Sequence, residues 1–300
     1  MIFKNKILAQ YQNGNTSVKI YEDGTKIREY EGTPNISHPE SIDVKITNYC
    51  DNGCRYCHEM STAKGIHGDL NKLLNIIKDL PSGVELAIGG GNPLSHPDLI
   101  PFLFELKKRG IISNITVNQA HLYQFNNLIA SLIKDGLIHG IGISITSLNF
   151  EYIKSILKLT DNVVFHLIAG VNKIDIINKL IQLEKCKILI LGYKTFGFGI
   201  DYFNDSIKNE LQRWNILLRK YIGKCTMSFD NLAIEQLNVK KLFTIEGWEK
   251  FYMGDDFCFT MYIDAVKQEY APTSRSLNRK SFNEISLINY FISESRKKIK

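Results

Sequence analysis

The chain has 300 residues, of which 44% are hydrophobic, and a formal net charge of +6. This length is sufficient for a full buried core, as one large domain or as one domain with small additions. The longest apolar runs, such as the one within residues 186–193, are far shorter than the roughly 20 residues of a membrane-spanning helix. No long apolar segment typical of a secretory signal opens the chain. We therefore expect a soluble, cytoplasmic protein with no membrane partner.

The six cysteines do not indicate a disulfide framework, because the cytosol is reducing. Cysteines that cluster in such a protein indicate metal binding or catalysis instead. Part of the positive charge lies in the terminal run 295-SRKKIK-300. A basic tail can contact nucleic acid, so a nucleic-acid partner is not excluded, but a solvated chain end is the simpler interpretation.

The first forty residues predict a small β-meander and a linker. Residues 6 to 31 alternate in part and carry two hairpin signals, Asn13-Gly14 and Asp23-Gly24. A polar stretch follows. We therefore assign residues 1–40 to an N-terminal meander and linker.

From residue 42 onward, short β-branched runs alternate with longer amphipathic stretches. This rhythm indicates βαβ units, a parallel sheet and right-handed crossovers. It predicts an α/β core at 41–200, a partial barrel of the (β/α)6 type, with a doubly wound open sheet as the alternative. The expected strands are 43–47, 84–88, 114–118, 140–145, 162–168 and 187–193. The expected helices lie near 69–79, 97–109, 121–135, 149–159 and 173–185.

After residue 200 the rhythm weakens, and we assign residues 201–300 to a C-terminal extension that caps the barrel. The expected elements are a helix near 205–221, a strand at 225–229, two strands around a turn within 258–274, and a final helix near 282–297.

The segment 48-NYCDNGCRYCHE-59 places three cysteines, Cys50, Cys54 and Cys57, within eight positions. Structural zinc needs four protein ligands, so a zinc site would require His58 or His67 as the fourth. A [4Fe–4S] cluster usually has four thiolate ligands, so three thiolates leave one iron open to a small molecule. The trio follows the first strand of the α/β region, at the carboxyl end where such folds bind ligands.

The pattern Cys50-x3-Cys54-x2-Cys57, on a loop after the first barrel strand, resembles the signature of the radical S-adenosylmethionine superfamily. The resemblance implies that these cysteines hold a [4Fe–4S] cluster whose open iron binds S-adenosylmethionine. It further implies reductive cleavage of S-adenosylmethionine to a 5′-deoxyadenosyl radical, which abstracts hydrogen from a substrate. A reductase such as flavodoxin or ferredoxin is then the implied electron-donating partner.

Residues after successive strands match the same family. Tyr56 matches an aromatic position near the adenine, and 89-GGGNP-93 is similar to a glycine-rich segment that contacts the methionyl group, with Asn92 where relatives often have Glu. Ser144 and Thr146 are placed where the ribose is usually held, and Asn172 where the adenine is lined. The cofactor contacts implied by the resemblance are Tyr56, Gly89, Gly90, Gly91, Asn92, Asn118, Ser144, Asn172 and Lys194.

The C-terminal part resembles the β-hairpin of the SPASM and twitch extensions of peptide-modifying relatives, which hold auxiliary iron–sulfur clusters. The resemblance rests on Cys258, on 261-MYID-264 and on 271-APTS-274. Thr273 occupies a position where a relative would have cysteine. Cys186, Cys225 and Cys258 are far apart in sequence and are expected to be buried small hydrophobes, so we expect no second cluster.

These observations predict a radical S-adenosylmethionine enzyme whose substrate the sequence leaves open. A peptide side chain or small molecule is favoured by the C-terminal hairpin, and a nucleotide or nucleic acid is supported by the positive charge alone. A non-catalytic zinc-binding protein is the alternative from another class. His58 and Glu59, directly after the cysteines, are candidates for hydrogen bonds around the cluster.

Overall fold

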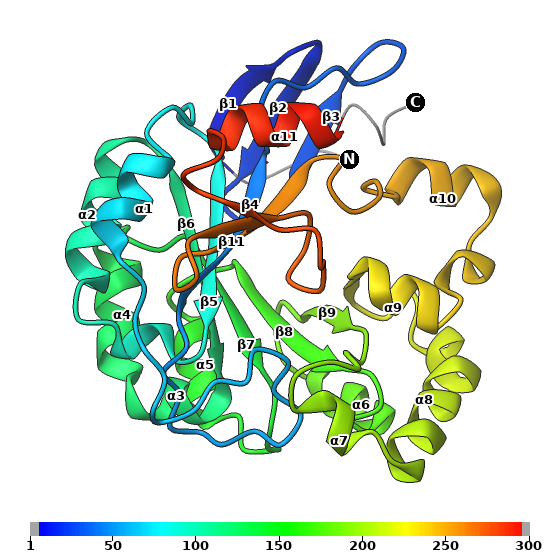
Figure 1. Ribbon diagram of the computed structural model, residues 1–300. Helices are drawn as coiled ribbons and strands as arrows, with labels where there is room; N and C mark the ends of the chain where they lie inside the picture. Colours follow the sequence, from blue (N-terminus) through cyan, green and yellow to red (C-terminus); the bar gives the residue numbers. More distant parts are fainter. Residues whose placement is uncertain (1–5, 296–300) are drawn as a thin grey trace.

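A ten-stranded, largely parallel sheet forms the centre of the structure, a computed structural model that describes residues 6–295 (Figure 1). The strand order is β10-β9-β8-β7-β6-β5-β4-β11-β12-β13, in which β12 and β13 run antiparallel and the other strands run parallel. The parallel strands are β4 (Ser41–Thr47), β5 (Glu85–Gly90), β6 (Ile112–Asn118), β7 (Gly140–Ser144), β8 (Val163–Ile168), β9 (Lys187–Leu191), β10 (Thr226–Phe229) and β11 (Thr260–Asp264).

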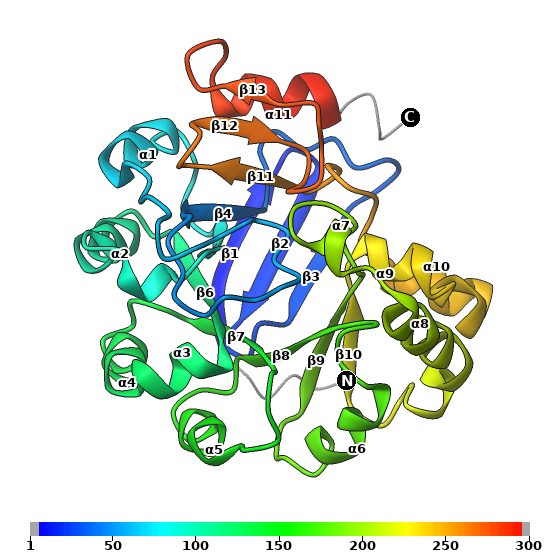
Figure 2. The same cartoon turned by 60° about the horizontal axis from the view of Figure 1, so that its bottom comes forward.

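The sheet curves, and its helices lie along its outer face (Figure 2). The sheet does not close, because β10 and β13 form its two ends. The predicted partial α/β barrel is therefore confirmed. The helices of this region are α1 (Leu70–Ile76), α2 (Leu99–Lys108), α3 (Gln119–Gln124), α4 (Asn126–Lys134), α5 (Glu151–Leu157) and α6 (Ile177–Leu180).

Alternation along β4 explains the two faces of the sheet. Ile42, Val44 and Ile46 are buried in the main apolar core, whereas Asp43 and Lys45 line a cavity on the inner side. Successive side chains of a strand point to opposite faces, so one strand supplies both the core and the cavity.

Two of the expected helices are shorter than their patterns indicate. The helix expected at 121–135 is split between α3 and α4, because Phe125 has backbone angles of −112° and 22° and ends one helix while starting the next. The stretch 173–185 contains a 3-10 turn at Ile174–Ile176 and the single turn of α6. Lys185 has a φ of 57°, a conformation that no right-handed helix can include.

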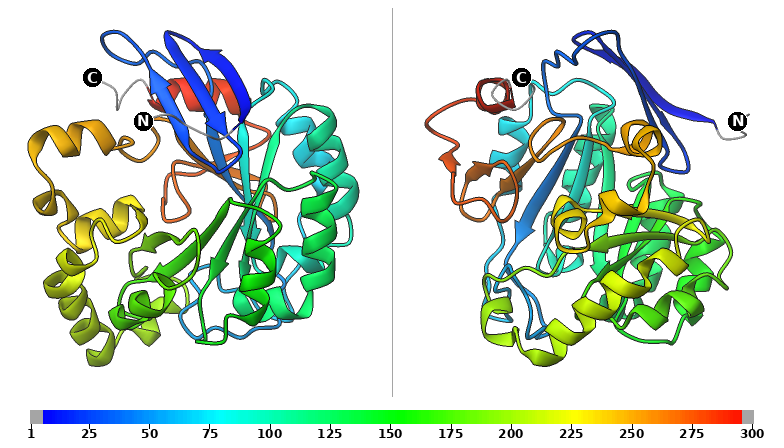
Figure 3. Two further views of the ribbon diagram at one scale, coloured as in Figure 1. Left: turned by 180° about the vertical axis from the view of Figure 1, so that it is seen from behind. Right: turned by 90° about the vertical axis from the view of Figure 1, so that its right-hand side faces the viewer.

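The N-terminal meander is present as a separate sheet of β1 (Ile7–Asn13), β2 (Thr16–Tyr21) and β3 (Lys26–Glu29). Its turns need glycine, since Gly14 and Gly24 have φ values of 61° and 83°. It lies at the end of the barrel where the strands begin (Figure 3). There Val18 and Ile20 pack on Ile112 at the start of β6.

The C-terminal third contributes both ends of the central sheet. It contains α7 (Gly199–Tyr202), α8 (Asp205–Leu217), α9 (Asn231–Gln236), α10 (Ile245–Phe251), β12 (Glu269–Ala271), β13 (Lys280–Ser281) and α11 (Leu287–Ser295). The expected strand near 225–229 is β10, and the expected hairpin is β11 and β12. The final helix starts later than expected, and its predicted end, like most of the basic tail, falls outside the described residues.

Strand β11 joins the sheet directly, since Thr260 to Asp264 pair in parallel with Ser41 to Lys45 of β4. The extension is therefore continuous with the strand that leads to the three cysteines. The boundaries 1–40, 41–200 and 201–300 remain predictions. In the part of the chain that the structure describes, no helix has the length and apolarity to cross a membrane.

Candidate functional site

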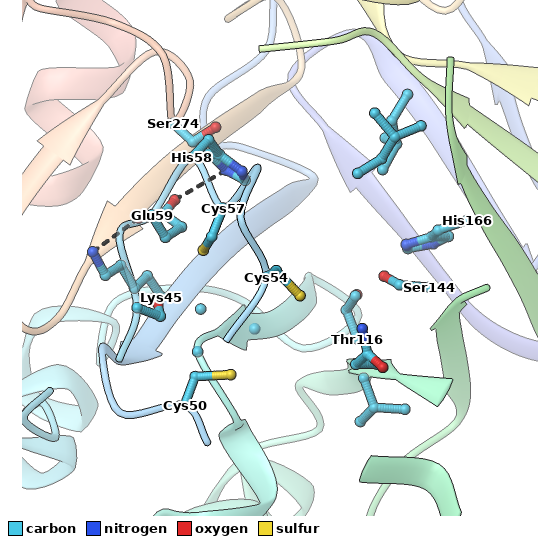
Figure 4. Close-up of a pocket in the computed structure, with 18 of the residues that line it drawn as sticks. Lys45, Cys50, Cys54, Cys57, His58, Glu59, Thr116, Ser144, His166 and Ser274 are labelled. Atoms are coloured by element: carbon cyan, nitrogen blue, oxygen red, sulfur yellow. Dashed lines mark ion pairs between the residues drawn. The ribbon is translucent and has the colours of Figure 1, made fainter. Parts of the chain in front are cut away.

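A cavity of about 340 Å³ lies within the curved sheet, and many of its lining residues come from the carboxyl ends of the strands and the loops that follow them. Cys50, Cys54 and Cys57 line one side of it, and Thr116, Ser144 and His166 line the other (Figure 4). Within residues 6–295, these three are the cysteines that line the cavity. The trio therefore lies at the carboxyl end of the first barrel strand, as the sequence pattern predicted.

The cysteine loop is held by backbone hydrogen bonds to neighbouring segments. The Cys50 N–H donates to the Thr62 carbonyl (2.9 Å), and the Phe198 N–H donates to the Cys57 carbonyl (3.1 Å). Asn52 donates from Nδ2 to Cys54 Sγ (3.1 Å). Burial raises the pKa of the Cys50 and Cys54 thiols, which favours their protonated form.

The spacing of the sulfur atoms differs from that of a mononuclear metal site. Among the described residues, the group of three or more cysteine, histidine or carboxylate ligand atoms that all lie within 4.8 Å of one another is Cys50, Asp51 and His121, and not the trio. Four ligands around one zinc ion are about 4 Å apart, because Zn–S bonds are about 2.3 Å long. A cluster binds each thiolate at a separate iron, which suits more widely spaced sulfur atoms.

His121 and Asp51 connect the cysteine loop to α3. The His121 ring is 2% exposed, and its Nε2 lies 2.8 Å from Asp51 Oδ1. Because Asp51 directly follows Cys50, this contact restrains the loop at its first cysteine. No role was predicted for His121 from the sequence pattern.

The predicted glycine segment contacts the backbone of the cysteine loop. Gly91 donates from its N–H to the Thr47 carbonyl (2.8 Å), and the Asn92 N–H donates to the Tyr49 carbonyl (2.7 Å). A Cβ at Gly91 would overlap the Tyr49 carbonyl oxygen, and Gly90 has a φ of 111°. All three glycines also line the cavity. Glycine is therefore required here, because the backbone of this segment lies directly against the backbone at the start of the cysteine loop.

The polar residues predicted at the strand ends differ in what their side chains contact. Asn118 lines the cavity and caps α3 through the Ala120 N–H (2.9 Å). Asn172 lines it too, but its amide binds the backbone of Ile168 (2.7 Å) and of Ile145 (2.8 Å). Asn92 is 1% exposed, is not among the lining residues, and caps a 3-10 turn. Asn172 and Asn92 therefore shape the backbone of the site, while their predicted cofactor contacts remain predictions.

Tyr56, Ser144 and Lys194 all line the cavity, and their predicted cofactor contacts remain predictions. The Tyr56 ring lies 5.8 Å from that of Tyr202. Lys194 Nζ lies 3.0 Å from His58 Nε2 and donates to Ser274 Oγ at 3.0 Å. Burial lowers the pKa of the Lys194 ammonium group, with neighbouring carboxylates acting in the opposite direction.

A buried charge cluster joins the cysteine loop to the C-terminal strand β11. Lys45 Nζ lies 2.8 Å from Glu59 Oε2 and 3.4 Å from Asp264 Oδ2, and the Tyr262 hydroxyl donates to Glu59 Oε1 (3.1 Å). Burial opposes ionisation of Glu59, but the hydrogen bond from His58 and the charges of His58 and Lys45 outweigh it and hold its pKa below the ordinary value. Glu59 is therefore ionised, and this side of the cavity is fixed by charge pairing.

The wall of the cavity also carries polar groups that the sequence analysis did not assign. Asp43 of β4 and His166 of β8 both line it. Burial lowers the pKa of His166 to about 4, so its imidazole is neutral near pH 7. Burial raises the pKa of Asp43, with Lys194 acting against this effect. The available signal was a period of two: Asp43 and Lys45 interrupt an apolar strand at positions that face inward.

The family model of the radical SAM superfamily matches residues 44–195, which includes the cysteine loop and the strands that line the cavity. The chain belongs to the radical SAM superfamily. Among curated proteins, none matches the chain.

Solved structures with a similar fold include those of SuiB from Streptococcus suis. The structure of SuiB bound to precursor peptide SuiA has a TM-score of 0.61 at 16% identity, covering 86% of this chain and 66% of that one. SuiB bound to S-adenosylmethionine gives 0.57 at 15% identity, with coverages of 86% and 65%. The chain thus spans slightly less than two thirds of these SuiB chains, and the likeness shows a shared fold.

Proposed function

We propose that Cys50, Cys54 and Cys57 hold a [4Fe–4S] cluster and that the cavity beside them binds S-adenosylmethionine. The observation that carries this proposal is the position of the trio: three free thiols on one side of a cavity, within the matched family region. When bound, the cluster supplies the electron that cleaves S-adenosylmethionine to a 5′-deoxyadenosyl radical, which abstracts hydrogen from the substrate.

The chain's own residues would bind and orient the reactants. Lys194 offers a buried ammonium group for a carboxylate, and Ser144 and Thr146 offer hydroxyl groups at the end of β7. On the opposite side, Glu59 of the loop would be held in place by Lys45 of β4 and by the Tyr262 hydroxyl of β11. The predicted cofactor contacts of Tyr56, Gly89, Gly90, Gly91, Asn118 and Asn172 fit a ligand in this cavity, since all of these residues line it.

A peptide side chain is the substrate class that we propose. The support is the fold shared with SuiB, one structure of which contains a precursor peptide, and the presence of a C-terminal strand pair beside the cavity. A flavodoxin or ferredoxin as the electron donor remains a prediction from the family resemblance.

The cluster assignment is tested by reconstituting the protein anaerobically with iron and sulfide. We expect about four irons per chain and a broad visible absorbance that bleaches on reduction. Cys54→Ser should lower the iron content and the absorbance strongly, whereas Cys258→Ser, which changes a buried cysteine outside the cavity, should leave both unchanged. A colourless protein that binds one zinc ion through the trio would contradict the assignment.

A further inference from the structure

Cys186 and Cys225 lie directly opposite each other at the beginning of neighbouring parallel strands. In the pairing of β9 with β10, Lys187 is the partner of Thr226 and Ile188 the partner of Met227. The residue before each strand is a cysteine, so the same register sets Cys186 against Cys225. Neighbouring strands are about 4.8 Å apart, within the Cα separation of roughly 4.4–6.8 Å that a disulfide requires.

The two side chains also lie on the same face of the sheet. Cys186 has the parity of the buried residues Ile188 and Ile190, and Cys225 has the parity of Met227. Both cysteines pack against the main apolar core while remaining partly exposed to solvent. The two thiols therefore lie side by side on one face of the sheet, and both are accessible to a small reagent.

Direct contact between the two side chains favours reaction between these thiols. The two side chains share a hydrogen bond, and this bond lowers the pKa of Cys225 while burial acts against it. The same hydrogen bond, together with burial, raises the pKa of Cys186. Cys225 is therefore the thiol of the pair that more readily supplies a thiolate, which is the form that attacks a disulfide.

The pair is separate from the site of the superfamily reaction. It lies at the amino ends of the strands, where Lys187 donates to the carbonyl of Asp23 in the N-terminal meander. Neither cysteine lines the cavity. Cys186 and Cys225 were expected to be buried small hydrophobes, and both do pack against the apolar core, although they remain partly exposed. Their separation in sequence conceals a strand pairing that closes 38 intervening residues into one loop.

We propose that Cys186 and Cys225 form a reversible disulfide by exchange with a low-molecular-weight disulfide such as oxidised glutathione. The Cys225 thiolate attacks one glutathione sulfur, which breaks the glutathione S–S bond and releases one glutathione thiolate. Cys186 then loses its proton to that thiolate or to buffer and attacks the Cys225 sulfur, which releases the second glutathione. Two protein thiols are oxidised, one glutathione disulfide is reduced to two thiols, and no other oxidant is needed.

The crosslink would join β10 to the barrel across a long loop. That loop contains α7 and α8. Beyond the pair, β9 continues to Leu189 and Leu191, which line the cavity, and β10 continues to α9. A disulfide restricts the unfolded chain, so the oxidised protein should have a higher Tm, by on the order of 5 °C.

The test uses the reconstituted protein under anaerobic conditions, incubated with oxidised glutathione and then alkylated and digested. We expect a peptide joining residues 186 and 225 to be the main disulfide product, and we expect dithiothreitol to remove it and the Tm increase together. Cys50, Cys54 and Cys57 are monitored in the same digest. Separate alkylation of both thiols, or a lasting glutathione adduct without a crosslink, would overturn the proposal.

Matched variants separate crosslinking from general thiol oxidation. Cys186→Ser should leave a glutathione adduct on Cys225 and abolish the Tm increase, whereas Cys258→Ser should behave as the wild type. The peptide analysis of the wild type stands even where a variant folds poorly. An unchanged Tm increase in Cys186→Ser would also overturn the proposal.

Discussion

At the residue scale, Gly91 marks a close backbone approach between two parts of the site. The Gly91 N–H is bonded to the Thr47 carbonyl (2.8 Å), and a Cβ at Gly91 would overlap the carbonyl oxygen of Tyr49. Tyr49 directly precedes the first cysteine. A side chain at Gly91 would therefore displace the start of the cysteine loop. At Gly89 a Cβ would meet nothing closer than Thr116 Cβ at 3.9 Å.

We predict that Gly91→Ala lowers the free energy of unfolding by about 2 kcal/mol, because the backbone must shift to accept the methyl group. The same variant should bind less iron after reconstitution, since Cys50 moves with Tyr49. Gly89→Ala is the matched control and should change the free energy of unfolding by less than about 0.5 kcal/mol. Urea unfolding and iron analysis measure both effects. Equal losses in the two variants would contradict this role for Gly91.

The sequence predicted residues whose chemistry depends on local spacing, and it was less informative about residues whose partners are distant. The cysteines are readable because a short spacing places them on one loop. Asn172 is different: its amide binds Ile145 in another loop, which no local pattern indicates. Asp43 could have been predicted from its inward position on an apolar strand. The contact between Lys194 and His58 could not, because 136 positions separate the two residues.

At the element scale, β11 links the C-terminal extension to the cysteine loop. It pairs with β4, and its Tyr262 hydroxyl donates to Glu59 Oε1 (3.1 Å) two residues after the last cysteine. Lys45 of β4 lies against the same carboxylate. The buried carboxylate thus depends on donors from two neighbouring strands, and removal of either donor leaves it less well compensated.

We predict that Tyr262→Phe lowers the free energy of unfolding by about 2 kcal/mol, because it removes a hydrogen bond to a buried charge. In a double-mutant cycle with Glu59→Gln, the coupling energy should be about 1–2 kcal/mol. Tyr270→Phe on β12 is the matched control, since the buried Tyr270 hydroxyl has no hydrogen-bond partner among the described residues. Additive effects of Tyr262→Phe and Glu59→Gln would argue against the link.

Alternating strands and helices between residues 42 and 195 could be predicted because each has its own period of apolar residues. The pairing of β11 with β4 could not, since it joins residues more than 200 positions apart. The break at Phe125 was also missed, because the apolar pattern continues through it while the backbone does not.

At the scale of the whole molecule, the two ends of the barrel carry different chemistry. The carboxyl ends hold the cavity with the cysteine trio, and the amino ends hold the meander and the Cys186–Cys225 pair. This arrangement separates the proposed cluster from the proposed disulfide, so that the two can be tested independently.

The central claim is that the trio and its cavity support reductive cleavage of S-adenosylmethionine. The most direct measurement is anaerobic: the reconstituted protein is given S-adenosylmethionine and dithionite, and 5′-deoxyadenosine is quantified, with Cys54→Ala and Cys258→Ala in parallel. The account predicts 5′-deoxyadenosine from the wild type and Cys258→Ala, and a loss of at least about 100-fold in Cys54→Ala. Equal 5′-deoxyadenosine from Cys54→Ala would contradict the account. So would the absence of 5′-deoxyadenosine from wild-type protein that contains its full cluster and has been supplied with a pool of peptides as substrate.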